Sequence, residues 1–349
     1  MLTRLGTARS RREFVSRMCL AAMAAPVMAA ALPGEATPTQ GPSKPLPFNA
    51  EGPFDVRVRP VAGHVEHLRQ LVQWQTFDHF GRVKWTREAI GYARKEEFRK
   101  EGQQEPWHRV TWKFLTEEDH DGYGQRLAAR VLPYSKNFSY ESPVTGGIWD
   151  AEMDLRAMPR TTEGFVFLHH SWDLQWTFYQ LSDKVVDFDK LKRIGDSVSA
   201  GVDPKALGDN WFTRPTWEFD FEPAVQYWLG ESSLTLSLGG LTKVGKHWCA
   251  LLLFDGTVPE RHAYRNSGGD SSLTYHVRTL LTGHYAISLE TNHVARCAWD
   301  HFAILGTEET PPKPRLMEAM PGLTLLWRQV LWMPVSEKEF AEAVPQVEG

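Results

Sequence analysis

Apolar and polar residues alternate along much of the chain after residue 109. A period of two places successive side chains on opposite faces, which is the pattern of a strand with one buried face. Asp255-Gly256 and Gly268-Gly269 are dipeptides typical of tight turns between such strands. The pattern predicts the strands Arg109–Leu115, Gln125–Leu132, Gly147–Ala157, Gly164–Gln180, Thr216–Glu222, Ser233–Leu238, His247–Phe254, Leu273–Leu281, His284–Thr291 and Val294–Leu305.

Helical spacing of apolar residues marks the segments outside this β-rich region. Val65–Phe77 follows a helical period, and Thr86–Lys100 begins with a threonine suited to capping a helix. Asp187–Leu207 is predicted as a helical insert and Arg315–Trp332 as an amphipathic segment. No GxGxxG turn and no P-loop accompanies the strands. We therefore expect a mainly β fold, an antiparallel β-sandwich of the jelly-roll type with helical additions at both ends.

Composition divides the chain into five predicted parts. A leader rich in Pro and Gly follows the N-terminal segment, and a Pro-rich break at Thr310–Pro314 precedes the C-terminal one. The parts are residues 1–31 (signal peptide), 32–54 (flexible leader), 55–106 (helical N-terminal extension), 107–307 (β-sandwich domain) and 308–349 (C-terminal linker and helix).

The first 31 residues are typical of a twin-arginine export signal. Arg11 and Arg12 precede Phe14, and the apolar run Met18–Ala31 that follows is too short and too rich in alanine to span a bilayer stably. We expect a periplasmic or secreted bacterial protein that uses the twin-arginine export machinery and has no stable membrane span.

Charge narrows the range of partners. The whole chain has a net charge of −4, and residues 1–31 carry five arginines and one glutamate, so the remainder has a net charge of −8. An acidic protein is a poor match for a polyanion, so we expect no nucleic-acid partner.

Two cysteines, Cys249 and Cys297, lie beyond the signal segment. In an oxidising compartment they can pair, and two buried thiols are the alternative. Because the two residues fall on predicted strands that can be neighbours, we predict one disulfide.

The segment Thr216–Glu222 carries the clearest candidate chemistry. Its alternation places Glu218, Asp220 and Glu222 on one face and aromatic residues on the other. Adjacent carboxylates repel one another, and catalytic sites use such groups to separate their pKa values. The alternative is the solvated polar face of a half-buried strand.

The motif Glu218-Phe219-Asp220-Phe221-Glu222 resembles the active-site strand of glycoside hydrolase family 16, whose members have a concanavalin-like jelly roll. The resemblance covers residues 147–305. It implies that Glu218 is the nucleophile, that Glu222 is the acid/base and that Asp220 tunes both. Phe219 and Phe221 stand where the family usually has aliphatic residues, and Pro223 follows at once.

Aromatic residues extend the carbohydrate hypothesis. The chain has 14 tryptophans, and flat aromatic faces stack on sugar rings. Trp211, Trp228 and Trp248 lie close to the acidic strand in sequence or on neighbouring strands, so we expect them to bind substrate. We also expect His169 and Asp173, on the polar face of the predicted strand Gly164–Gln180, to contact it.

A metal site is the rival hypothesis. His169, His170 and Asp173 are close in sequence, and imidazole with carboxylate suits Zn, Cu or Fe. Further candidate ligands are His284, Glu290, His293, Asp300 and His301. We expect no cofactor, with a divalent metal as the alternative.

These observations predict an exported glycan-active protein, a retaining glycoside hydrolase that cleaves a β-linked polysaccharide or oligosaccharide with paired glutamates. The alternatives are a non-catalytic glycan-binding module and a metal-dependent periplasmic enzyme.

Overall fold

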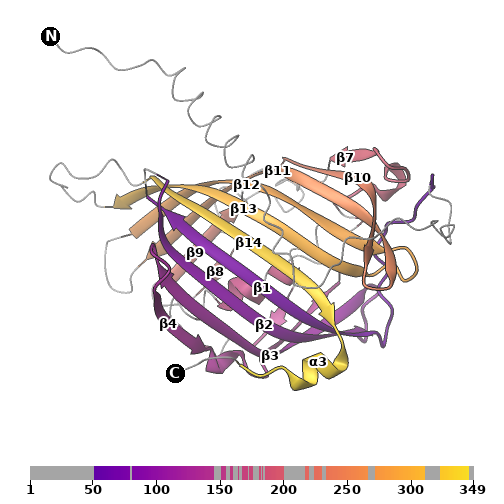
Figure 1. The fold of residues 1–349 in the computed structure, drawn as a ribbon, viewed down its shortest axis with the longest axis horizontal. Helices are drawn as coiled ribbons and strands as arrows, with labels where there is room; N and C mark the ends of the chain where they lie inside the picture. Colours follow the sequence, from indigo (N-terminus) through magenta and orange to yellow (C-terminus); the bar gives the residue numbers. More distant parts are fainter. Residues whose placement is uncertain are drawn as a thin grey trace, which may run out of the picture. The chain divides into compact units, whose positions relative to one another are not determined.

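The computed structural model describes residues 51–345 apart from 79–80, 145–150, 155–157, 160–163, 165–166, 172, 176–180, 182, 184, 200–216, 220–223, 230–232, 266–271 and 311–322. Antiparallel strands dominate, and the helical parts are small, as predicted (Figure 1). The strands are β1 (Val65–Phe77), β2 (Val83–Arg99), β3 (Pro106–Asp121), β4 (Arg126–Val131), β5 (Ser139–Pro143), β6 (Glu152–Met153), β7 (Ser197–Ser199), β8 (Trp217–Phe219), β9 (Ala224–Leu229), β10 (Ser233–Val244), β11 (His247–Arg265), β12 (Ser272–Ser288), β13 (Val294–Thr310) and β14 (Leu323–Val335).

These strands form one sheet whose main path is β6-β5-β3-β2-β1-β14-β13-β12-β11-β10-β7. Off this path, β4 pairs with β3, and β9 pairs with both β11 and β8. The first and last strands of the sequence, β1 and β14, pair with each other (Figure 1). Val72 of β1 therefore lies opposite Ala89 of β2 on one side and Val330 of β14 on the other. Strands that are neighbours in the sequence are otherwise mostly neighbours in the sheet.

The helical N-terminal extension predicted for residues 55–106 is wrong. Val65–Phe77 and most of Thr86–Lys100 are β1 and β2, in the same sheet as the later strands. The inward face of these strands includes the buried polar residues Gln70, Lys95 and Glu97. Polar residues at buried positions hide the alternation on which a strand prediction depends.

The C-terminal segment differs from its prediction for a similar reason. Arg315–Trp332 was expected to be amphipathic and helical, but Leu323–Val335 is strand β14. Arg328 is buried within it, so the polar and apolar residues do not sort into two clean faces. The one helical turn described at this end is α3 (Glu337–Glu342), which begins after the capping residue Ser336.

The predicted strand Gly164–Gln180 is also wrong, because its described residues 164, 167–171 and 173–175 are helical. Both Leu168 and Asp173 are buried, although they belong to the two opposite faces of the predicted strand. The segment packs against the sheet, where Trp112 of β3 donates a hydrogen bond to the Ser171 hydroxyl over 3.1 Å. Enclosure on several sides therefore buries polar and apolar residues alike.

Two further segments differ in structure from their sequence predictions. The Asp255-Gly256 pair, predicted as a turn, lies inside β11. A Cβ at Gly256 would lie 2.0 Å from the Ser233 carbonyl oxygen of β10, so the glycine permits close approach of the neighbouring backbone. The predicted helical insert Asp187–Leu207 contains the short 3-10 turn Phe188–Lys190 and strand β7 in its described part.

The disulfide prediction is wrong, because Cys249 and Cys297 are buried thiols that are not joined by a disulfide. Cys249 of β11 pairs with Ser288 of β12, and Cys297 of β13 pairs with Tyr285 of β12. A whole strand therefore separates the two sulfurs. Two strand spacings amount to about 9.6 Å, beyond the roughly 7 Å that a disulfide tolerates between Cα atoms.

Residues Glu51–Gly349 form one compact unit. Its core includes the fully buried Trp112, Leu115 and Val330 of two strands, β3 and β14. Among the described residues, no helix is both long and apolar enough to cross a membrane.

Candidate functional site

A pocket of about 990 Å³ lies where several long strands begin or end. β14 ends at Val335, opposite His67 of β1, and the chain then turns away into α3 (Figure 1). The residues that precede β1 and β13 therefore face each other beyond the end of β14. We call this the histidine pocket; it is lined by Val61, His64, Val65, Glu66, His67, Arg94, His247, Ser288, Thr291, His293, Val294, Ala295, Pro334, Val335 and Glu337.

A buried lysine lies between two carboxylates behind the pocket wall. Lys95 of β2 is 1% exposed, and its Nζ lies 3.0 Å from Glu66 Oε2 and 2.7 Å from Glu97 Oε1. The sheet fixes this arrangement, because Glu66 is the cross-strand partner of Lys95 and Glu97 follows two residues later on the same face. Glu97 also accepts a hydrogen bond of 2.6 Å from the Val61 backbone N–H.

Two histidines complete the group on the pocket side. The imidazoles of His64 and His293 stack with their centroids 4.0 Å apart. His64 Nε2 lies 3.3 Å from Glu66, and His293 Nε2 lies 3.7 Å from Glu97. His64, Glu66, Lys95, Glu97 and His293 thus form a closed chain of contacts, which we call the His–Glu–Lys cluster.

The surroundings keep both carboxyl groups of this cluster ionised. Burial opposes ionisation of Glu97, but the His293 imidazole, Lys95 and the Val61 N–H lower its pKa from 4.5 to about 2. Burial also opposes ionisation of Glu66, but Lys95 and His64 lower its pKa to about 2. Burial would lower the pKa of Lys95, and the two carboxylates outweigh it, so that this pKa is raised.

His64 is the member of the cluster that is suited to exchange protons near neutral pH. The Glu66 carboxylate beside its imidazole raises its pKa above 6.5, and burial opposes this only in part. The cluster can therefore present a cationic imidazole to the pocket, while its carboxylates remain charged and tied to Lys95.

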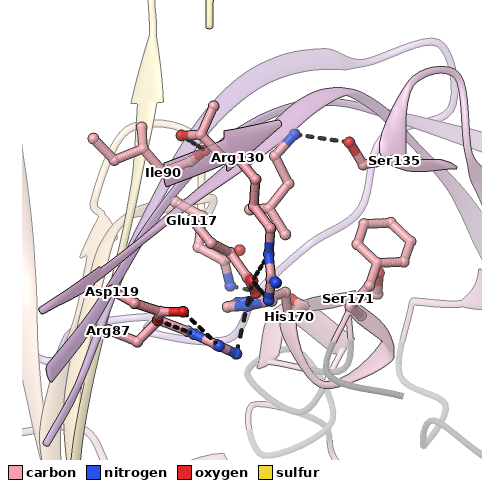
Figure 2. Close-up of polar contacts among 12 residues, drawn as sticks. Arg87, Ile90, Glu117, Asp119, Arg130, Ser135, His170 and Ser171 are labelled. Carbon is pink, nitrogen blue, oxygen red and sulfur yellow. Dashed lines mark hydrogen bonds and ion pairs between the residues drawn. The ribbon is translucent and has the colours of Figure 1, made fainter. Parts of the chain in front are cut away.

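A second buried polar network lies on β2, β3 and β4 and holds the helical segment against the sheet (Figure 2). Glu117 is 3% exposed, and its carboxylate contacts Arg130 at 2.7 Å, His170 at 3.4 Å and Arg87 at 3.7 Å. Arg87 also binds Asp119 through two hydrogen bonds of 2.7 and 3.0 Å. Each carboxylate has a cationic side chain beside it, so this network fits a structural role.

Asp173, predicted to contact substrate, lies in a buried ion pair. It is 4% exposed, and both of its carboxylate oxygens accept hydrogen bonds from the guanidinium of Arg328, one of them over 2.7 Å. Gln70 donates a further hydrogen bond of 3.2 Å to the same carboxylate. The neighbouring candidate His169 is partly exposed on the helical segment.

Only part of the predicted carboxylate site lies within the described residues. The backbone of Glu218 lies in β8, opposite Gln226 of β9, so this part of the motif is a strand as predicted. Asp220, Glu222 and Trp211 lie outside the described residues. Trp228 lies on β9 opposite Arg261, and Trp248 lies on β11 opposite Lys243.

The described candidate metal ligands do not lie together in one site. Asp300 accepts a hydrogen bond from Trp327, His301 lies 2.9 Å from Thr279, and His293 belongs to the pocket. Within the described part of the chain, no group of three or more His, Cys, Asp or Glu side chains is arranged to hold a metal ion.

Sequence reasoning had considered His293 only as a metal ligand and missed the other four members of the cluster. His64 and Glu66 are two residues apart, and so are Lys95 and Glu97. In a strand, residues two apart share a face, so this spacing is a signal that each pair of side chains lies on one face of a strand. Lys95-Glu96-Glu97 instead looks like a solvated charge run. Nothing local indicates that His293, far along the chain, meets His64.

No protein-family model matches the chain, and no curated protein matches it. A crystal structure from Bacteroides fragilis, described as that of an exported protein with a YmcC-like fold, is similar at 8% sequence identity. The comparison covers 80% of this chain and 100% of that chain, with a TM-score of 0.18. A similarity of this size carries no argument about function.

Proposed function

We propose that this chain is an exported protein that binds a small saccharide in the histidine pocket without cleaving it. The observation that carries the proposal is a pocket of about 990 Å³ whose largely apolar wall holds polar side chains already fixed by partners. Ligand sites typically have volumes of about 300–1,000 Å³, enough for one or two sugar rings. The export signal predicted for residues 1–31 supports a periplasmic or secreted location.

The pocket wall has the mixed character that a sugar requires. Val294, Pro334 and Val335 offer apolar surface to the carbon skeleton of a ring, and His64 and Glu66 offer polar groups to its hydroxyls. The polar groups are held by partners behind the wall. A ligand therefore loses little free energy in ordering them.

The ionisation of the cluster favours binding over hydrolysis. Retaining glycoside hydrolysis needs one protonated and one ionised carboxyl group about 5–5.5 Å apart. Here both Glu66 and Glu97 have a pKa of about 2, and both contact the same ammonium group. Neither can donate a proton near neutral pH, so the pocket fits the binding alternative.

Isothermal titration calorimetry on the chain from residue 32 onward tests this proposal. The panel is glucose, galactose, cellobiose and glucuronate. We expect at least one to bind with a Kd below about 1 mM, and we expect His64→Ala to weaken that binding by at least about tenfold. His120→Ala is the matched control, because His120 lies beside Glu118 on β3 and does not line the pocket. Equal loss in both variants, or binding by neither the wild type nor the variants, contradicts the proposal.

Hydrolysis at the acidic strand is the second candidate function. It is favoured by one observation, that Trp217–Phe219 is a strand paired with β9, so that Glu218 has the backbone setting which the resemblance implies. The test is release of reducing ends from β-glucans and galactans. Loss of this activity in Glu218→Ala supports hydrolysis, and equal activity in wild type and variant rules it out.

A further inference from the structure

We propose that the saccharide bound in the histidine pocket carries one carboxylate, and that its binding leaves both His64 and His293 protonated. This inference rests on the proposed function and specifies its ligand as a monoanionic acidic sugar.

The charges of the His–Glu–Lys cluster carry the argument. Two ionised carboxylates and one ammonium group leave one negative charge. One proton on the histidine pair balances it. A second proton would place two like charges on rings whose centroids are 4.0 Å apart, which is unfavourable in a partly buried site. One anionic group from the ligand would offset that second charge.

His293 provides an independent sign that the pocket accommodates a hydrogen-bond acceptor. The residue is 9% exposed, and neither of its ring nitrogens has a hydrogen bond among the described residues. Its Nε2 lies 3.7 Å from Glu97, which is too far for a good hydrogen bond. A buried imidazole that lines a pocket without a hydrogen bond can take an acceptor from a ligand. A carboxylate oxygen is such an acceptor, and a protonated imidazole is its natural donor.

The other charged groups around the histidine pair are mostly balanced by their own neighbours. Arg94 lies 2.7 Å from Glu96, and His247 lies 3.0 Å from Glu290. Burial and the charge of Lys95 lower the pKa of His108 to about 3, which keeps it neutral. Among the described residues that line the pocket, the remaining titratable groups are His67, which packs on Phe340, and Glu337, which is solvent-exposed at the start of α3.

A single charge on the ligand suits this arrangement better than a double one. With both histidines protonated, the cluster carries three positive and two negative charges, so one carboxylate makes the site neutral. A dianion such as a phosphate monoester would leave a net negative charge near Glu66 and Glu97. We therefore expect the pocket to prefer glucuronate to both glucose and glucose 6-phosphate.

Calorimetry with these three sugars on the chain from residue 32 onward tests the inference. Titrations in two buffers of different ionisation enthalpy report the protons taken up on binding. We expect glucuronate to bind at least about tenfold more tightly than either competitor, with uptake of about one proton near neutral pH. Its affinity falls as the pH rises and His64, whose pKa is raised by Glu66, loses its proton.

The variant His293→Gln keeps a polar side chain of similar reach but cannot be protonated. We expect it to retain a thermal unfolding midpoint close to that of the wild type and to lose the preference for glucuronate and the proton uptake. His120→Gln is the control and keeps both. Equal affinity for glucose and glucuronate without proton uptake overturns this inference and leaves the proposed function standing. Absence of binding to any sugar overturns both.

Discussion

Replacing Lys95 with methionine tests whether the His–Glu–Lys cluster is held together by its buried cation. Methionine has nearly the same length as lysine, so the change removes the charge and keeps the packing. Lys95 is 1% exposed and contacts Glu66 and Glu97 at 3.0 and 2.7 Å. Breaking a buried ion pair by removing one partner costs about 3–5 kcal/mol. We expect a loss of that size at pH 7.

The pH dependence of this loss follows from the two carboxyl groups. In the wild type their pKa values are lowered from 4.5 to about 2, which corresponds to about 3 kcal/mol of stability for each group as an upper bound. Because the folded-state pKa values are depressed, this stability is complete above pH 4.5 and is lost as the pH falls toward 2. Without Lys95, burial raises the pKa of both groups, and they protonate in acid. The deficit of the variant therefore shrinks as the pH falls.

Urea denaturation measures the free energy of unfolding of wild type and Lys95→Met at pH 7 and at about pH 4. Lys84→Met is the matched control, because Lys84 is an exposed lysine of the same strand, and a surface change of this kind alters stability by about 0.5 kcal/mol or less. A loss below about 1 kcal/mol for Lys95→Met at pH 7, or an equal loss at both pH values, would refute the reasoning.

Three further predictions concern the sheet and its helical segment. The denatured, unreduced chain from residue 32 onward should show two reactive thiols in a colorimetric assay, from Cys249 and Cys297, and an absence of thiols would contradict the strand register. Gly256→Ala should destabilise the protein by about 1–3 kcal/mol in chemical denaturation, because its Cβ would overlap the Ser233 carbonyl; a neutral change would contradict that approach. Asp173→Ala should cost about 3–5 kcal/mol by the same measurement, because it leaves a buried guanidinium unpaired, and a cost near zero would show that the pair is open to solvent.

The sequence predicted the later strands better than the earlier ones, and the reason lies in the inward side chains. In β10, Leu234, Leu236 and Leu238 are all buried, so the alternation is plain. In β2 the corresponding buried positions include Lys95 and Glu97, which pattern reasoning assigns to solvent. These buried charges are tolerated because each has an opposite charge on a neighbouring side chain. Only the pairing register of β1 and β2 shows which side chains are neighbours, and the sequence alone does not give that register.

The candidate site could not be assembled from the sequence because its parts are distant along the chain. His64 and His293 meet only because β14 lies between β1 and β13 and ends one residue before Ser336. The acidic motif at Glu218 is local and was therefore easy to find. A local motif can be found in the sequence, whereas a cluster of residues distant along the chain is found only in the structure. In this chain the described residues support the His–Glu–Lys cluster as the candidate site.

The most direct test of the account is the protonation state of the two pocket histidines with and without ligand. Nitrogen-15 NMR of the imidazole rings, assigned through His64→Gln and His293→Gln, reports that state at pH 7. The account predicts at most one imidazolium in the free protein and two after saturation with glucuronate. Ring nitrogen shifts of both histidines that stay unchanged on addition of glucuronate would contradict it.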